Sequence, residues 1–164
     1  MGPDCRYFLG VDFAHQHELA FYVDQLAGED LQWQVPGKWH LTLCFLGNHI
    51  PEQCSKLSVL PLSEQLVRVQ AVALFSHRKQ TILTLDCRTP QLMRWRKAVL
   101  DAFSLADDEW HPHITLGRGK PAVLKKLALP PVDITLKAQC VYLFASSAQT
   151  KHQYQKIYTY ALEK

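Results

Sequence analysis

One four-residue pattern occurs twice in the sequence and limits the folds that the chain can adopt. A histidine, an aliphatic residue, a threonine and a leucine stand at 40–43 and again at 113–116. The two copies are separated by close to half the length of the chain. Each copy lies in an apolar run of strand character and is followed by a turn and a proline, Pro51 or Pro121. The repeat predicts two similar β-α-β passages, each of which presents one copy of the pattern.

Strand geometry gives the repeat a chemical meaning. Residues i and i+2 of a strand point to the same face, so His40 lies beside Thr42 and His113 lies beside Thr115. The aliphatic residue between them points to the opposite face, into the core. Two such strands facing each other would hold two imidazoles on either side of a small space, with two hydroxyls next to them.

This set of side chains suits the opening of a cyclic phosphodiester. One group must take a proton from water, and another must give a proton to the leaving alkoxide. Histidine, with a reference pKa near 6.5, serves either purpose near neutral pH. Threonine hydroxyls donate hydrogen bonds to the non-bridging phosphate oxygens, which gain charge in the transition state. Arg118, near the end of the second strand, adds a positive charge.

Two other interpretations of these histidines stay open at the level of sequence. In the first, His40 and His113 are half-buried structural side chains, and the threonines reflect only the strand preference of that residue. In the second, His111, His113 and His40 are ligands of a metal ion. Because no Asp, Glu or Cys falls in a convincing ligand position, we expect neither a metal nor a cofactor.

Composition places the chain among ordinary globular proteins. The 164 residues are 48% hydrophobic and 20% charged, with a net charge of +3, and we expect one domain over 1–164. No apolar run has the length of a membrane span, and residues 1–10 lack the apolar core of a signal peptide. We therefore expect a cytoplasmic protein. Its five cysteines, odd in number and without a C-x-x-C pair, are expected to be reduced thiols.

Strand and helix signals are mixed along the chain. Strands are predicted at 6–13, 39–46, 67–73, 81–87, 113–118, 134–145 and 154–162, with a hairpin turn at 76–80. Helices are predicted over 19–28 with Gly28 as the stop, over 51–60, and from Pro90 and Pro121 onward. This order favours an α+β fold over a doubly wound parallel sheet.

The chain resembles the two-histidine phosphoesterases, specifically the LigT-like RNA 2′,3′-cyclic phosphodiesterases, also called 2′-5′ RNA ligases. The resemblance covers essentially the whole chain and rests on RYFLGVDF at 6–13, WHLTLCFLG at 39–47, HPHITLGR at 111–118 and YLFASS at 142–147. It implies a bilobal fold with pseudo-twofold symmetry, in which two antiparallel or mixed sheets form a central cleft and helices lie outside. It also implies metal-free conversion of a 2′,3′-cyclic phosphate to a 2′-phosphomonoester.

The resemblance implies roles for individual residues. His40 is the expected general acid, His113 the general base, and Thr42, Thr115 and Arg118 bind phosphate. The expected substrate is RNA with a 2′,3′-cyclic phosphate end or a nucleoside 2′,3′-cyclic phosphate, with no membrane and no obligate protein partner. The alternatives are a 2′-5′ RNA ligase or 2′-5′ phosphodiesterase acting on oligonucleotides, and a non-catalytic binder of RNA ends or nucleotides.

Two features depart from the family pattern. The segment SLADDEW at 104–110 is short, which suggests a trimmed loop at the edge of the cleft. His111 stands two residues before His113, where many members have arginine. Both departures concern the range of substrates rather than the chemistry.

Overall fold

The computed structural model describes residues 4–14, 16–26, 31–34, 38–147 and 154–163. Strands dominate this part of the chain, and four helices lie between them. The elements are β1 (Arg6–Ala14), α1 (His17–Leu26), β2 (Gln32–Trp33), β3 (His40–Gly47), α2 (Gln53–Lys56), β4 (Val59–Leu60), β5 (Gln65–Val69), β6 (Ala71–His77), β7 (Gln80–Asp86), α3 (Pro90–Ala102), β8 (His113–Gly119), α4 (Pro121–Lys125), β9 (Ile134–Ala138), β10 (Val141–Ser146) and β11 (Tyr154–Leu162).

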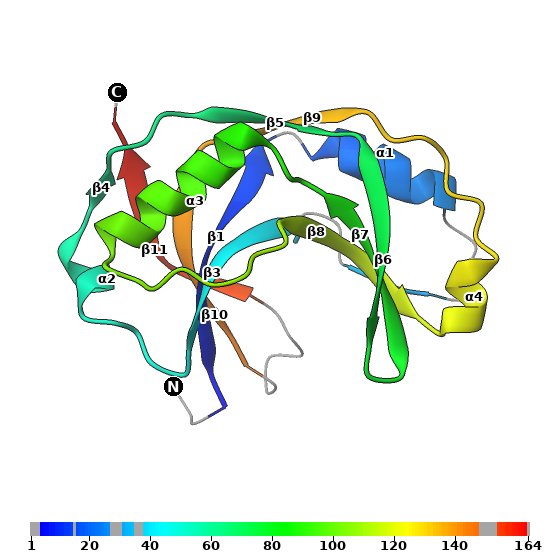
Figure 1. Cartoon of the computed structure of the whole chain (residues 1–164), viewed down its shortest axis with the longest axis horizontal. Helices are drawn as coiled ribbons and strands as arrows, with labels where there is room; N and C mark the ends of the chain where they lie inside the picture. The colour runs from blue at the N-terminus through cyan, green and yellow to red at the C-terminus, as the bar shows by residue number, and fades with distance from the viewer. Residues whose placement is uncertain (1–3, 15, 27–30, 35–37, 148–153, 164) are drawn as a thin grey trace.

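Backbone pairing connects all the described strands. The main path runs β4-β11-β10-β1-β3-β8-β7-β6, while β2 pairs with β8 and β9 bridges β1 and β5. Every pairing is antiparallel except that of β11 with β4. In Figure 1, β1, β10 and β11 stand on one side of the β3–β8 pair, and the β6–β7 hairpin projects on the other side.

The sequence repeat becomes a structural repeat about the β3–β8 pair. The passage β1-α1-β3 corresponds to the passage β7-α3-β8, and the two meet where Leu41 pairs with Ile114. Each motif histidine lies opposite an aspartate on the neighbouring strand of its own unit. His40 pairs with Asp12 of β1, and His113 pairs with Asp86 of β7. The predicted pair of β-α-β passages is therefore present.

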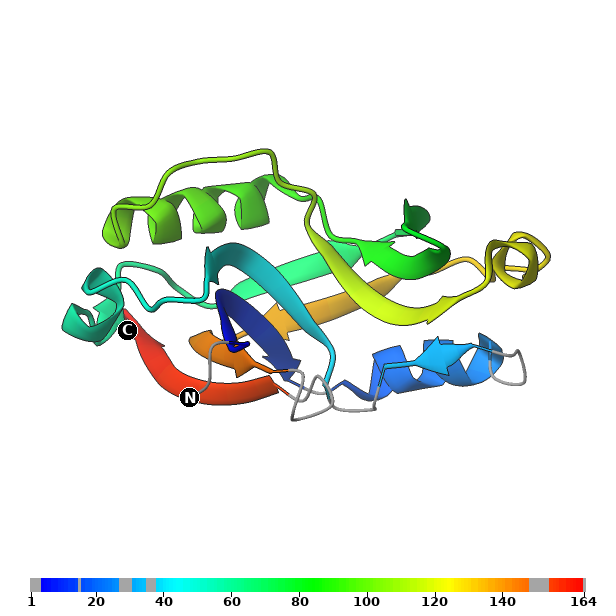
Figure 2. The same ribbon diagram turned by 90° about the horizontal axis from the view of Figure 1, so that it is seen from below.

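Helix α3 follows the sequence signals closely. The Thr89 side chain accepts a hydrogen bond from the Leu92 backbone N–H at 3.2 Å, and Pro90 occupies the first turn. The predicted face of Leu92, Trp95, Val99 and Phe103 is buried in the core. Helices α3 and α1 lie on opposite sides of the strands, as Figure 2 shows. The helix starts predicted at Pro90 and Pro121 are confirmed.

The helix predicted from Pro51 to Leu60 was wrong in length and in its start. Only Gln53–Lys56 is helical, and Leu57 is already extended. Val59 and Leu60 instead form β4, which pairs with Ala161 and Leu162 of β11. A proline at position 61 biases the residue before it away from helix, and the edge of β11 provides the hydrogen bonds.

The single strand predicted over 134–145 is divided into two. β9 ends at Ala138 and β10 begins at Val141, because the first part leaves the main path to pair with β5. The short strand β2 carries no apolar alternation and was not predicted. The helix stop predicted at Gly28 lies outside the described residues.

The predicted α+β class is confirmed. The predicted division into two sheets is not confirmed, because strand pairing links the described strands into one branched sheet. None of the described helices has the length and apolar character needed to cross a membrane.

Candidate active site

The four residues of the two His-x-Thr pairs lie on one face of the β3–β8 pair. Leu41 and Ile114 are directly paired, and both are completely buried. Because neighbouring residues of a strand point to opposite faces, the residues on either side of this pair share the other face. His40, Thr42, His113 and Thr115 are all half-buried there. The structure thus brings together the four residues, while their chemical roles stay predictions.

Both motif strands have a β-bulge at the same place. Thr42 pairs with Gly10 and Cys44 with Leu9, so that the leucine between them is the extra residue. On the other side, Thr115 pairs with Thr84 and Gly117 with Leu83, so that the leucine at 116 is extra. A bulge changes the phase of the side chains by one residue. The fifth residue after each histidine therefore returns to the histidine's face.

The fifth residue after the histidine differs in chemistry between the two units. In the second unit this residue is Arg118, which pairs with Ile82 and is exposed. The predicted phosphate-binding arginine therefore lies on the same face as His113 and Thr115. In the first unit the residue is Phe45, which pairs with Phe8 and is 76% exposed. An arginine and an exposed aromatic ring thus occupy equivalent positions in the two halves of the site.

The two imidazoles are anchored in the same way. Nδ1 of His40 lies 3.2 Å from the carbonyl oxygen of Lys38, and Nδ1 of His113 lies 2.7 Å from that of His111. A carbonyl only accepts hydrogen bonds, so Nδ1 carries the proton in both rings. This leaves Nε2 of each ring as the nitrogen that gains or loses a proton during a reaction.

Aromatic rings surround His40. The centroid of its ring lies 4.4 Å from that of Tyr154, 5.2 Å from that of Phe8 and 5.8 Å from that of Phe144. Burial lowers the pKa of His40 below its ordinary value of 6.5, and the nearby His113 lowers it further. The Lys38 carbonyl and Asp12 act in the opposite direction. The effect of His113 on the pKa of His40 shows that the two imidazoles lie within electrostatic range of each other.

A cavity of about 300 Å³ opens beside His40. The ion pair of Asp12 with Lys156 forms part of its wall. The residues that line the cavity are Asp12, Lys38, Trp39, His40, Phe144, Tyr154 and Lys156. A larger cavity of about 540 Å³ lies between α1 and residues 131–134, and none of the predicted site residues lines it. Of the predicted site residues, His40 lines the smaller cavity, and His113, Thr42, Thr115 and Arg118 do not.

Among the described residues, His113 has fewer aromatic and more polar neighbours than His40. Within the described ranges, the aromatic neighbour of His113 is Phe75 of the β6–β7 hairpin, and the centroids of the two rings lie 5.7 Å apart. Next to it, Arg88 Nη2 lies 3.0 Å from Nδ1 of His111, and Nε2 of His111 lies 3.3 Å from Glu109. Both nitrogens of the His111 ring therefore have protein partners. Within the described ranges, no three His, Cys, Asp or Glu side chains are placed to hold a metal ion.

A buried arginine secures the strand that carries His40. Arg96 of α3 is 5% exposed, donates from Nε to the Leu43 carbonyl at 3.0 Å, and forms ion pairs with Asp107 and Asp108. Its guanidinium lies over the ring of Trp110 at 4.9 Å, and Trp110 Nε1 donates to the Thr42 carbonyl at 3.0 Å. The short 104–110 segment thus packs across β3 and fixes the carbonyls at the bulge.

Sequence reasoning missed the aromatic wall and the arginine clamp. Burial raises the pKa of the Tyr154 hydroxyl, and the nearby charge of Arg118 acts in the opposite direction. Tyr154 therefore lies between His40, whose ring it contacts, and the charge of Arg118. For the aromatic wall, the sequence signal was the presence of Phe8, Phe144 and Tyr154 in predicted strands. Strand periodicity does not reveal which strands become neighbours, so this signal did not predict that the three rings meet at His40.

Comparison with solved structures identifies the fold. E. coli LigT has a TM-score of 0.76 and 20% identity, with 99% of this chain and 100% of that chain covered. A crystal structure described as a phosphoesterase has a TM-score of 0.72 and 19% identity, with 97% of this chain and 99% of that chain covered. TT0787 of Thermus thermophilus has a TM-score of 0.69 and 20% identity, with 97% of this chain and 100% of that chain covered. No family model and no curated protein sequence matches the chain.

These similarities extend over the whole chain. The protein therefore has the fold of the two-histidine phosphoesterases, and within that class it has a LigT-like fold.

Proposed function

We propose that the protein is a phosphodiesterase that hydrolyses a 2′,3′-cyclic phosphate on RNA or a nucleotide to a 2′-phosphomonoester. The observation that carries the proposal is the matched pair of imidazoles. Both lie on one face, and both have Nδ1 bonded to the carbonyl of the residue two positions earlier. A structural histidine needs only one satisfied hydrogen bond, whereas two equivalent Nε2 atoms that have no hydrogen-bond partner within the described ranges suit an acid and a base.

The proposed step is an in-line displacement at phosphorus. Nε2 of His113 takes a proton from water as the water oxygen forms a bond to phosphorus. The bond from phosphorus to O3′ breaks, and protonated Nε2 of His40 gives its proton to O3′. The product keeps the P–O2′ bond. The lowered pKa of His40 makes its protonated form a stronger acid, and the anionic phosphate beside it favours the charged ring.

Thr42, Thr115 and Arg118 stabilise the charge that develops on the phosphate in this proposal. The two hydroxyls lie on the same face as the imidazoles, and the bulge in β8 directs Arg118 to that face. Hydrogen bonds from preorganised donors to the non-bridging oxygens are stronger in the transition state than in the ground state. In this view, the two β-α-β units are the two lobes, and the His-x-Thr face between them is the cleft.

Known complexes of a protein with the same fold support a nucleotide substrate. E. coli LigT has been crystallised with phosphate and with 3′-AMP. Each of these two structures has a TM-score of 0.73 and 20% sequence identity to this chain. In this chain, exposed Phe45 on the His40 face offers a surface on which a base can stack. A phosphate-binding arginine and an aromatic platform on one face match the two ends of a nucleotide.

Turnover of adenosine 2′,3′-cyclic phosphate tests the proposal. We expect hydrolysis that persists after dialysis against excess EDTA, with adenosine 2′-phosphate as the product by ³¹P NMR. A 3′-phosphate product would contradict the assigned direction of bond breaking. Activity that is lost to the chelator and restored by zinc would contradict the histidine mechanism. Joining of RNA ends without hydrolysis would favour the 2′-5′ ligase alternative.

A further inference from the structure

The charged residues of the protein are distributed unevenly along the chain. Residues 71–85 and 113–127 contain six of the eighteen lysines and arginines and none of the fifteen aspartates and glutamates. The rest of the chain therefore holds more acidic than basic residues. The six cations are Arg78, Lys79, Arg118, Lys120, Lys125 and Lys126, and all of them are exposed. We refer to these six residues as the basic edge.

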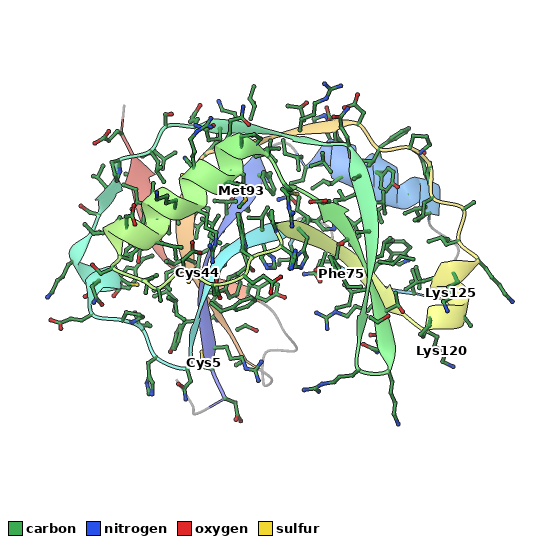
Figure 3. The ribbon with its side chains drawn as sticks, viewed as in Figure 1. Cys5, Cys44, Phe75, Met93, Lys120 and Lys125 are labelled. Carbon is green, nitrogen blue, oxygen red and sulfur yellow. The ribbon has the colours of Figure 1, made fainter. Side chains whose placement is uncertain are left out.

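Strand register brings most of the basic edge together. Arg78 and Lys79 form the tip of the β6–β7 hairpin, where His77 pairs with Gln80. Gly119 of β8 pairs with Thr81, so that Lys120 follows next to the hairpin tip. Figure 3 shows Lys120 and Lys125 on the same side of the molecule as the projecting hairpin. The acidic residue of β7, Asp86, lies at the opposite end of that strand, beside His113.

These cations are not used for holding the fold together. In the described part of the chain, none of the six lies within ion-pair distance of a carboxylate. Among the described cations elsewhere, five have carboxylate partners, namely Lys56, Arg68, Arg96, Lys137 and Lys156, and five have none within the described ranges, namely Arg6, Lys38, Arg88, Arg94 and Lys97. The basic edge differs from these five in that its cations are not interspersed with carboxylates along the chain. A cluster of exposed, unpaired cations attracts a polyanion, and neutralisation by the ligand's phosphates releases counterions.

The basic edge is continuous with the proposed site. Strand β8 begins at His113 and ends at Gly119, which is a distance of roughly 20 Å along an extended chain. Arg118 lies on the histidine face near the far end of that strand, and Phe75 of the hairpin contacts His113. Phe75 is 39% exposed and can stack on a base next to the reacting phosphate. Basic grooves that follow a single strand usually cover about 4–16 nucleotides.

We infer that the basic edge binds the phosphate backbone of an RNA strand whose cyclic phosphate end lies at His40 and His113. The inference rests on the proposed function and narrows its substrate to an oligoribonucleotide rather than a free nucleotide. The terminal phosphate contacts the histidine face, and the preceding nucleotides follow β8 toward the hairpin tip and α4. A mononucleotide bound there contacts Arg118 but does not reach the other five cations.

The test compares two substrates and two sets of substitutions. The substrates are adenosine 2′,3′-cyclic phosphate and a hexaribonucleotide that ends in a 2′,3′-cyclic phosphate. The test variant combines Arg78→Gln, Lys79→Gln, Lys120→Gln and Lys125→Gln. The matched control combines Arg94→Gln and Lys97→Gln, which are exposed on α3. All of these side chains are exposed, so thermal melting should match that of the wild type and confirm that each variant is folded.

We expect the four-site variant to lose most of the advantage of the hexamer. Four phosphate contacts give a slope of about −2.8 for log affinity against log salt, or about a 50-fold loss between 50 and 200 mM. In the variant, kcat/KM for the hexamer should fall by at least tenfold at low salt and lose most of this salt dependence. Its kcat/KM for the cyclic nucleotide should stay within twofold. The control should match the wild type with both substrates.

Binding of a fluorescent hexamer with a 2′-phosphate end, followed by anisotropy, separates the two proposals. If the cyclic nucleotide is hydrolysed but the hexamer binds equally well to wild type and four-site variant, the inference is wrong and the proposed function stands. If neither substrate is hydrolysed but hexamer binding still depends on the four cations, the proposed function is wrong and the RNA surface stands. An equal loss of binding in the α3 control would also overturn the inference.

Discussion

The two halves of the candidate site have the same backbone and different surroundings. Each half has a strand with a His-x-Thr pair, a bulge after the threonine, and a carbonyl that holds Nδ1 of the imidazole. The half around His40 is enclosed by aromatic rings and carries Phe45 at the bulge position. The half around His113 has the Phe75 ring beside the imidazole and carries Arg118, a member of the basic edge, at that position.

This difference shows how a structural repeat can bind an asymmetric substrate. The equivalent parts place two proton-transfer groups on either side of one phosphate. The parts that differ give each side of that phosphate its own chemistry: an apolar wall that suits a base, and a row of cations that suits further phosphates. The backbone repeat thus serves the reaction, and the side chains that break the repeat serve the orientation of the substrate.

The largest effect is expected from removing either imidazole. His40→Ala and His113→Ala should each lower kcat for adenosine 2′,3′-cyclic phosphate by about 10²–10⁴-fold, and the double variant should lose little more. A substrate with an activated leaving group, such as bis(p-nitrophenyl) phosphate, distinguishes the roles, because p-nitrophenolate leaves without a proton. On that substrate His40→Ala should retain most activity, and His113→Ala should not. The reverse result would exchange the acid and the base.

The arginine clamp should have the next largest effect, on stability. Arg96→Met removes hydrogen bonds from a charged, buried group to the Leu43 carbonyl and two carboxylates. A hydrogen bond to a charged group contributes about 1.5–3 kcal/mol, so we expect the free energy of unfolding to fall by about 3 kcal/mol. Urea denaturation measures this change. Arg94→Met, on the exposed side of α3, is the control and should change stability by less than about 0.5 kcal/mol. Equal stability of the two variants would refute the clamp.

Substitutions at the two bulge positions compare the halves directly. Arg118→Gln should lower kcat/KM by about 10–100-fold, since it removes a charged donor to the phosphate worth about 1.5–3 kcal/mol. Phe45→Ala should raise KM by about fivefold, which corresponds to about 1 kcal/mol of stacking on an exposed ring, with little change in kcat. Steady-state kinetics with adenosine 2′,3′-cyclic phosphate measures both. A larger effect of Phe45→Ala than of Arg118→Gln would contradict this assignment of the halves.

The smallest effect concerns the pKa of His40. Burial by the aromatic rings should place its NMR titration midpoint below 6.5. Tyr154→Ser opens this wall and should raise the pKa of His40 toward 6.5. With His40 as the acid, the decline of kcat/KM at high pH should then move to higher pH. Tyr158→Ser, at an exposed position of the same strand, is the control. A His40 midpoint at or above 6.5 in the wild type would contradict the proposed enclosure.

Local sequence patterns predicted the elements that depend on neighbouring residues. The cap at Thr89 with Pro90, the turn between β6 and β7 and the strand character of both motifs needed only short-range information. Prediction failed where partners are distant along the chain. Val59 and Leu60 became a strand because β11 lies beside them, and the 134–145 run was divided because β5 pairs with its first part.

The pairing of each histidine with its threonine on one strand face follows from the sequence, because the two-residue period of a strand is a local property. That the two faces coincide follows from the fold, through the pairing of Leu41 with Ile114. The fold also brings Phe45 and Arg118 to those faces, since a bulge is defined by the register with a neighbouring strand. The aromatic wall around His40 combines side chains from β1, β10 and β11, and such contacts depend on which distant strands the hydrophobic core brings together.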